Sequence, residues 1–181
     1  PLLTVVMPVF NEEATVLQVI ERVLAASIES LELIVVDDGS TDQTAKILDQ
    51  QFGQEKEVTV VRQPQNRGKG AAIKTGLQRA RGQFVIIQDA DFEYDPQDYL
   101  RLISPLRENR ADVVYGSRFL SERARWEGRL GHSVANRFLT KYSNVITGLK
   151  LTDMETCYKV FRRDLAQQLD LRESRFGIEP E

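Results

Sequence analysis

Apolar residues gather along this chain in short, nearly continuous runs, most of them followed by a polar turn and a segment with helical spacing. The runs are rich in β-branched residues and do not alternate with polar ones, which is typical of strands buried on both faces. We predict strands over residues 2–7, 31–36, 58–61, 84–87, 111–115 and 158–161.

Helical spacing separates these runs. After the first run, Val16, Ile20 and Val23 recur at three- and four-residue intervals and predict a helix with one apolar face. We expect Asn11 to cap this helix, with Glu12 in its first turn. Strands and helices alternate four times, which predicts an α/β fold: a Rossmann-like, mostly parallel sheet with helices on both faces.

Polar turns carry the chemistry of the predicted sheet. Pro8 is expected to end the first strand, Asp37-Asp38 follow the second, and Asp89-Ala90-Asp91 follow the strand at 84–87. The carboxyl ends of parallel strands lie along one edge, where open α/β sheets bind ligands. The first strand is therefore a candidate switch point, with neighbours supplying Asp38 and Asp89.

Asp37 and Asp38 are adjacent like charges, which repel unless a ligand, a donor or a cation uses them. One carboxylate can accept the imide N–H of a uracil ring and the other a ribose hydroxyl. Alternatively, both belong to an ordinary strand–turn–helix connection, in which Ser40 or Thr41 caps the next helix and Asp42 lies in its first turn.

Asp89 and Asp91 offer two hard oxygen ligands on one short turn, which suits Mg²⁺ or Mn²⁺ shared with phosphate oxygens. Glu93 is a candidate third ligand, directly or through water. The alternative is an acidic turn that ends a strand. Further on, Asp95-Pro96 predicts a helix start, so Asp95 is expected to be structural.

Two basic positions are candidate phosphate ligands. Lys69 stands among glycines before a helix expected to run through Ala80, where a phosphate can approach the backbone; the alternative is close packing by small residues. Arg118, after the strand at 111–115, can clamp a phosphate in bidentate fashion or form a surface ion pair.

Residues 120–129 predict a long basic loop containing Arg123, Arg125, Trp126 and Arg129, a composition that suits a lid or an anionic lipid surface. Residues 133–146 predict an amphipathic helix with Phe138, Tyr142 and Ile146 on its apolar side. Its pattern leaves two alternatives open: the helix covers the sheet, or it lies on a bilayer.

Composition removes several classes of protein. The 181 residues suit one domain, and a formal charge of −3 with a pI near 5.4 argues against a nucleic-acid partner. The sequence has no run of eighteen or more apolar residues, so we expect no membrane-spanning helix within it. One cysteine, Cys157, fits a reducing compartment, and one histidine, His132, argues against zinc sites and His-dependent triads. The chain starts at Pro1 without Met, so we expect a fragment whose membrane anchor, if present, lies outside it.

A resemblance joins these motifs. Pro8-Val9-Phe10-Asn11-Glu12, Asp37 to Asp42, Asn66-x-Gly68-Lys69-Gly70, Asp89-Ala90-Asp91 and Gly116-Ser117-Arg118 resemble family 2 glycosyltransferases of the GT-A fold, and more narrowly dolichyl- or polyprenyl-phosphate mannosyl- and glucosyltransferases. The likeness covers nearly the whole chain as a single GT-A catalytic domain. It implies an inverting transferase that uses a UDP- or GDP-sugar and a divalent metal, at the cytoplasmic side of a membrane.

The resemblance also implies roles for individual residues. Pro8, Phe10, Glu12 and Asp38 would contact the nucleoside; Asp89 and Asp91, with Ala90 between them, would hold the metal and the diphosphate; Arg118 would bind the acceptor phosphate or the donor. Glu93 stands where many lipid-phosphate members have Gln. The Gln-x-x-Arg-Trp motif of processive synthases is absent, since Glu122 precedes Arg125-Trp126, and this favours transfer of a single sugar.

The acceptor decides whether a general base is needed. A lipid monophosphate is already anionic near neutrality, whereas a saccharide hydroxyl needs a proton acceptor, for which Asp153 is the candidate, although a turn or cap role is the alternative. Two other functions stay open: a nucleotidyltransferase, which would normally have a basic glycine-rich loop after the first strand, and a non-catalytic nucleotide-sugar-binding domain. Nothing in the sequence indicates an oligomeric state.

Overall fold

A six-stranded sheet forms the centre of the protein, whose computed structural model describes residues 1–120, 130–174 and 177. The strand order is β3-β2-β1-β4-β6-β5, and only β6 runs antiparallel to its neighbours. The strands are β1 (Leu3–Val9), β2 (Leu31–Asp37), β3 (Val58–Arg62), β4 (Phe84–Ile87), β5 (Val113–Tyr115) and β6 (Lys159–Arg162). The predicted basic loop with Arg123, Arg125, Trp126 and Arg129 lies outside the described residues.

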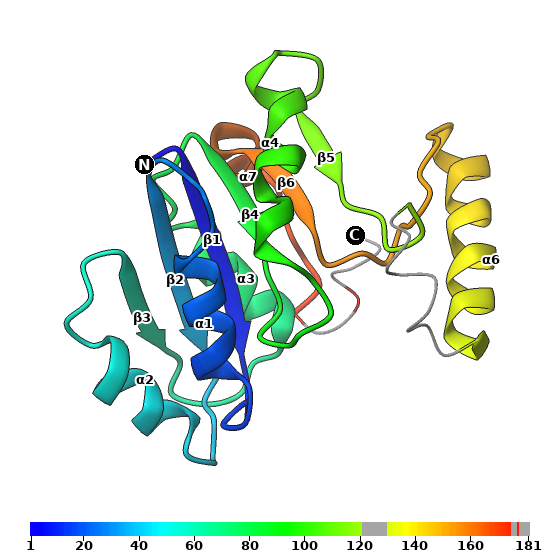
Figure 1. Ribbon diagram of the computed structural model, residues 1–181. Helices are drawn as coiled ribbons and strands as arrows, with labels where there is room; N and C mark the ends of the chain where they lie inside the picture. The colour runs from blue at the N-terminus through cyan, green and yellow to red at the C-terminus, as the bar shows by residue number, and fades with distance from the viewer. Residues whose placement is uncertain (121–129, 175–176, 178–181) are drawn as a thin grey trace.

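Helices cover both faces of this sheet, so the predicted α/β architecture is confirmed (Figure 1). Helices α1, α2 and α4 lie on one face and α3 and α7 on the other, while α6 stands apart from the sheet. The helices are α1 (Val16–Leu24), α2 (Thr44–Phe52), α3 (Lys69–Leu77), α4 (Tyr99–Arg107), α6 (Leu130–Thr147) and α7 (Arg163–Gln168), with a 3-10 turn η1 (Pro96–Asp98) before α4.

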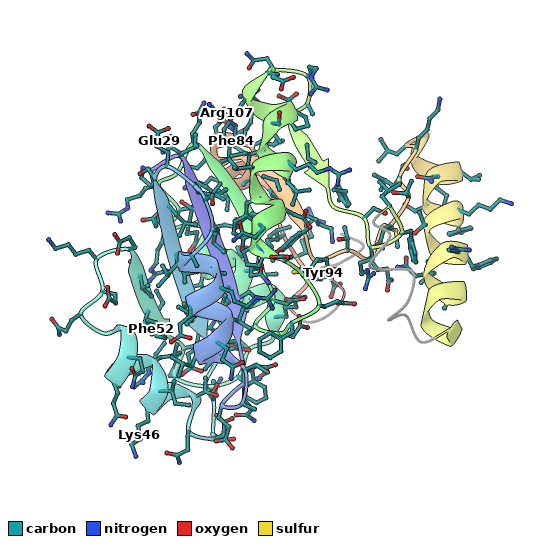
Figure 2. All side chains as sticks on the ribbon, in the orientation of Figure 1. Glu29, Lys46, Phe52, Phe84, Tyr94 and Arg107 are labelled. Atoms are coloured by element: carbon teal, nitrogen blue, oxygen red, sulfur yellow. The ribbon has the colours of Figure 1, made fainter. Side chains whose placement is uncertain are left out.

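Burial explains the apolar runs. Every residue of β1 and β4 is buried, because both strands are central and are covered on both faces. Figure 2 shows Phe84 within this core, whereas Glu29, Lys46 and Arg107 project from the periphery, where they are exposed. The strand β1 lies between β2 and β4, which confirms that the ends of these three strands meet at one edge.

Pro8 does not end β1, as the sequence predicted, but lies within it and pairs with Val36 of β2. On the other side, β4 ends at Ile87, which pairs with Val6. The missing N–H of Pro8 therefore faces a place where the neighbouring strand has already stopped, and no ladder hydrogen bond is lost.

Asn11 does not cap α1, which begins five residues later, at Val16. Its backbone is left-handed, with φ of 56°, and its side-chain oxygen accepts a hydrogen bond from the Thr41 backbone N–H at 2.8 Å. Glu12 consequently lies before the helix and not in its first turn. The connection after β1 is therefore hydrogen-bonded to the connection after β2, and Asn11 does not cap the helix that follows it.

Helix α6 buries polar residues and exposes apolar ones. Its polar residues Asn136 and Thr140 are buried, whereas Phe138, Tyr142 and Val145 are exposed. The helix does not pack on the sheet (Figure 1), so the first of the two sequence alternatives is wrong. None of the helices within the described residues has the length and apolar character needed to cross a membrane.

Candidate active site

The two adjacent acids at the end of β2 accept hydrogen bonds from backbone N–H groups. Asp37 accepts a hydrogen bond from the Ser40 backbone N–H at 3.0 Å. Asp38 accepts one from the Arg67 N–H at 2.9 Å and one from the Gly68 N–H at 2.7 Å. Both side chains are buried, so Asp38 fixes the loop before α3 in place. The repulsion noted in the sequence is offset by these bonds.

The connection after β1 interlocks with this turn. The Asn11 N–H donates to Ser40 Oγ at 3.0 Å, and the Glu12 N–H donates to Thr44 Oγ1 at 2.9 Å. The Glu12 carboxylate accepts from the Thr15 hydroxyl at 2.7 Å. Phe10 is left 42% exposed, one residue after β1, and presents an aromatic ring at the same edge as Asp38. An exposed ring beside polar groups suits the stacking of a flat heterocycle.

The Asp89-Ala90-Asp91 segment is held by a buried residue that sequence reasoning missed. Gln88 accepts hydrogen bonds from Tyr99 at 2.8 Å and from Tyr158 at 2.7 Å, and its amide donates to the Asp89 carbonyl at 2.8 Å. Burial raises the pKa of both tyrosines, so their hydroxyls remain donors near neutral pH. Gln88 thereby joins the end of β4 to α4 and to the start of β6.

Asp91 and Glu93 have different partners. Asp91 accepts a hydrogen bond from the Glu93 backbone N–H at 3.0 Å, which closes the acidic turn. The Glu93 carboxylate lies 3.1 Å from the guanidinium of Arg118. Glu93 therefore points to Arg118, and we found no group of three acidic, histidine or cysteine side chains arranged to hold a metal within the described residues.

Lys69 lies inside the candidate site. Its ammonium is 2.8 Å from one Asp89 oxygen and 2.9 Å from the other, and both side chains are largely shielded from solvent. Gly68, with φ of 97°, turns the chain so that Lys69 begins α3 at this point. The sequence predicted a phosphate ligand here; in the structure Lys69 contacts the first acid of the Asp89–Asp91 pair.

Gly70, the second residue of α3, packs closely against the C-terminal segment and not against the sheet. A Cβ at that position would collide with the Glu173 carbonyl oxygen. The Ala71 backbone N–H donates to the Ser174 carbonyl at 3.1 Å, so the C-terminal segment uses a donor of the first helical turn. Small residues here serve contact with that segment.

Arg118 forms the densest polar cluster of the site. Its Nε and Nη2 donate to the two oxygens of Asp153 at 2.8 and 3.0 Å, and its backbone N–H donates to Asp153 at 3.1 Å. These bonds raise the pKa of Arg118 further above its usual range. Burial alone would raise the pKa of Asp153, but the hydrogen bonds from Arg118 and from Asn136 outweigh it and lower that pKa.

Asp153 is poorly placed for the proton-acceptor role that the sequence suggested. Its carboxylate is fully buried, and each oxygen already accepts two hydrogen bonds, three in all from Arg118 and one from Asn136 at 2.8 Å. A lowered pKa makes it a weaker base. The geometry instead makes Asp153 the residue that orients Arg118.

A cavity of about 490 Å³ opens beside Arg118, between α1, α4, β5 and the loop after β4. Its wall combines aromatic and aliphatic side chains with arginines and acids. Tyr94, which Figure 2 labels on this loop, stacks on Tyr158 with ring centroids 4.5 Å apart. The lining includes Arg22, Phe92, Tyr94, Leu102, Tyr115 and Arg118.

The sequence singled out charged residues and missed the neutral ones that hold them. Gln88 lies between an apolar run and Asp89. This position, which predicts a buried amide, is the signal that the sequence offers for it. Asn136 and Thr140 are spaced four residues apart, which places them on one helix face. That spacing is a signal for a polar contact surface on α6.

Comparison with known proteins gives a consistent result. The profile of Glycosyl transferase family 2 matches residues 4–170. A dodecaprenyl-phosphate galacturonate synthase of Rhizobium johnstonii is 33% identical over 173 residues, covering 93% of this chain and 50% of that protein. The low-salt glycan biosynthesis hexosyltransferase Agl6 of Haloferax volcanii is 34% identical over 174 residues, covering 94% of this chain and 40% of that protein.

Solved structures extend the comparison to the fold. Glucosyl-3-phosphoglycerate synthase of Mycobacterium tuberculosis in complex with UDP superimposes with a TM-score of 0.73 at 27% identity, covering 99% of this chain and 62% of that one. The same enzyme with Mn²⁺, UDP and glucosyl-3-phosphoglycerate gives a TM-score of 0.70 at 25% identity, covering 99% of this chain and 62% of that one. The chain spans about half the length of the curated relatives it matches. The chain belongs to glycosyltransferase family 2 and has the GT-A fold.

Proposed function

We propose that this domain transfers one sugar from a nucleoside diphosphate sugar to a polyprenyl phosphate. The observation that carries the proposal is the edge of the sheet at which Asp38, the Asp89–Asp91 turn and Arg118 follow three different strands. The name of the dodecaprenyl-phosphate galacturonate synthase, one of the relatives, supports the choice of acceptor.

The nucleoside is assigned to the β1–β2 side of this edge. We assign Phe10 to stacking on the base and Asp37 and Asp38 to its polar groups and the ribose, with Pro8 and Glu12 shaping the loop. Both acids already accept backbone hydrogen bonds, but a carboxylate oxygen has a second lone pair available to a ligand.

The diphosphate is assigned to Asp89, Ala90, Asp91 and Lys69. The two carboxylates fit Mg²⁺ or Mn²⁺, because hard oxygen ligands on one turn leave further positions for phosphate oxygens. Glu93 would complete the ligand set after release from Arg118. When bound, such a cation neutralises the charge that develops on the leaving nucleoside diphosphate.

The acceptor is assigned to the cavity beside Arg118. Its guanidinium binds a phosphate, while Phe92, Leu102 and Tyr115 supply apolar walls for the start of a lipid chain. A phosphate oxygen then attacks the anomeric carbon from the face opposite the leaving group and inverts it. This oxygen is anionic near neutrality, so no protein base is required. The full pairing of Asp153 disfavours the alternative with a saccharide hydroxyl acceptor.

A polyprenyl phosphate resides in a membrane, and α6 supports a location at the membrane surface. Its exposed side carries Phe138, Tyr142, Val145 and Ile146, which are 61% to 78% exposed. Residues of this kind on one helix bind the interface between lipid head groups and acyl chains. We assign the domain to the cytoplasmic surface, either peripherally or through an anchor elsewhere in the protein.

Calorimetric titration tests the donor site. UDP and GDP are titrated with and without Mn²⁺ into the wild type, Asp91→Ala and the control Asp170→Ala, whose carboxylate is exposed and pairs with Arg172. We expect metal-dependent binding of one nucleotide that is weakened at least tenfold in Asp91→Ala and unchanged in the control. Equal weak binding in all three proteins, without a metal effect, favours a non-catalytic binding domain. Sugar transfer to undecaprenyl phosphate in vesicles then tests the acceptor.

A further inference from the structure

The position of Lys69 differs from the one expected of a phosphate ligand in the free protein. Its ammonium contacts both Asp89 oxygens, at 2.8 and 2.9 Å, instead of pointing toward open space for a phosphate. The two side chains are only 15% and 23% exposed, so solvent screens this ion pair less than a surface pair. In the structure Asp89 already has a cation.

The contact has a consequence for metal binding. A divalent cation on Asp89 would use the same two oxygens that Lys69 occupies, and two positive charges at such distances repel. Asp91 forms no ion pair with any of the described residues. It accepts a hydrogen bond from the Glu93 backbone N–H. A metal that arrives alone therefore competes with Lys69 for one of its two main ligands.

A nucleoside diphosphate changes this balance, because its phosphate oxygens can hold the metal and the ammonium together. We propose that Lys69 is an internal counter-cation that occupies Asp89 in the free protein and transfers to the diphosphate when nucleotide and metal bind. This inference rests on the proposed function, since it takes Asp89 as a metal ligand. It makes the binding of metal and nucleotide mutually dependent, and such coupling is reciprocal.

The helix start gives Lys69 the means to move. Lys69 is the first residue of α3, and its backbone is fixed by Gly68, which donates to Asp38 at 2.7 Å. Its four-carbon side chain can therefore pivot about a fixed Cα, and a lysine ammonium binds phosphate as a compact point charge. The hydrogen bond between Gly68 and Asp38 joins the start of α3 to the turn assigned to the nucleoside. The Lys69 ammonium therefore stays close to the site assigned to the diphosphate.

Mn²⁺ binding to the protein tests the proposal without an activity assay. Electron paramagnetic resonance of free Mn²⁺ gives the affinity of the wild type, Lys69→Met and Lys69→Gln, each with and without UDP or GDP. The control is Lys74→Met, on the same helix, whose ammonium donates to the Leu171 carbonyl at 3.3 Å. Circular dichroism checks that each variant is folded.

We expect Lys69→Met and Lys69→Gln to bind Mn²⁺ alone about tenfold more tightly than the wild type, within the usual range of coupling between sites. The enhancement of Mn²⁺ binding by nucleotide should fall by a similar factor, and Lys74→Met should match the wild type. If the Lys69 variants bind Mn²⁺ alone no more tightly, while nucleotide still enhances binding, the counter-cation inference is overturned and the donor site stands. If no protein binds Mn²⁺ even with nucleotide, the metal site and the inference both fall.

Discussion

The pair of Arg118 and Asp153 predicts an unequal response to the loss of either partner. Asp153 is fully buried, and when Arg118 becomes Met it loses its counter-ion and keeps two hydrogen bonds, from the backbone N–H of residue 118 and from Asn136. Arg118 is 27% exposed and keeps Glu93, the Glu155 carbonyl and water when Asp153 becomes Asn. A fully buried charge without a counter-ion is far more costly than a partly exposed one, so the two variants should differ in stability.

Arg118→Met should lower the free energy of unfolding by about 3–5 kcal/mol, the usual cost of removing one partner from a buried ion pair. Asp153→Asn should lower it by about 1–2 kcal/mol, comparable with the loss of one or two hydrogen bonds. The double variant should cost less than the sum, because no buried charge is left unpaired. Urea denaturation followed by circular dichroism at pH 7 measures all three.

The pH dependence gives a second, signed test. The pKa of Asp153 in the folded wild type is lowered, so its contribution to stability is present above the unfolded pKa, about 3.9, and is lost as the pH falls through the folded value. In Arg118→Met only two hydrogen bonds still oppose the effect of burial, so that pKa should rise, and the variant should recover part of its deficit as the pH falls from 7 toward the unfolded pKa. Equal costs for the two single variants, or a deficit in Arg118→Met that does not change with pH, would refute this account.

Two further predictions concern packing. Gly76→Ala should cost about 1–3 kcal/mol in urea denaturation, because the new methyl group collides with Val6 Cγ1, and adding Val6→Ala should give less destabilisation than the sum of the two changes; strict additivity would argue against the contact. Gln63→Leu should raise the free energy of unfolding by about 1 kcal/mol, since the two polar atoms of this buried amide have no hydrogen-bond partner among the described residues. The exposed Gln78→Leu should change it by under about 0.5 kcal/mol, and a loss of stability in Gln63→Leu would contradict the prediction.

The sheet was predictable because burial on both faces leaves an uninterrupted apolar run in the sequence. Phe84–Ile87 is the clearest example, and its position beside β1 followed from the alternation of strands and helices. The edge with Asp38 and Asp89 followed in turn, since parallel strands end together. Strand ends were less predictable: Pro8 remains in β1 only because β4 stops first, and no local pattern records where a neighbouring strand stops.

The polar supports of the site were not predictable from single residues. The contacts of Gln88 with Tyr99 and Tyr158 join positions up to 70 residues apart. Lys69 was a candidate phosphate ligand because of the glycines around it. Its partner Asp89 lies twenty residues away, so the local sequence does not reveal the ion pair. Helix α6 left two alternatives open for another reason: its apolar pattern does not show which side contacts the rest of the protein, and in the structure the polar residues Asn136 and Thr140 are buried.

That contact has a geometric consequence. Asn136, Thr140 and Asn144 lie at intervals of four residues and bond, respectively, to Asp153, the Met154 N–H and the backbone of Leu151. Apolar side chains can slide and rotate past one another, but hydrogen bonds have direction and fix how a helix is turned about its own axis. The side of α6 that carries Tyr142 and Ile146 therefore has a fixed orientation relative to Arg118. A bilayer in contact with that side would therefore lie at a fixed angle to the domain and at a fixed distance from the Arg118 guanidinium.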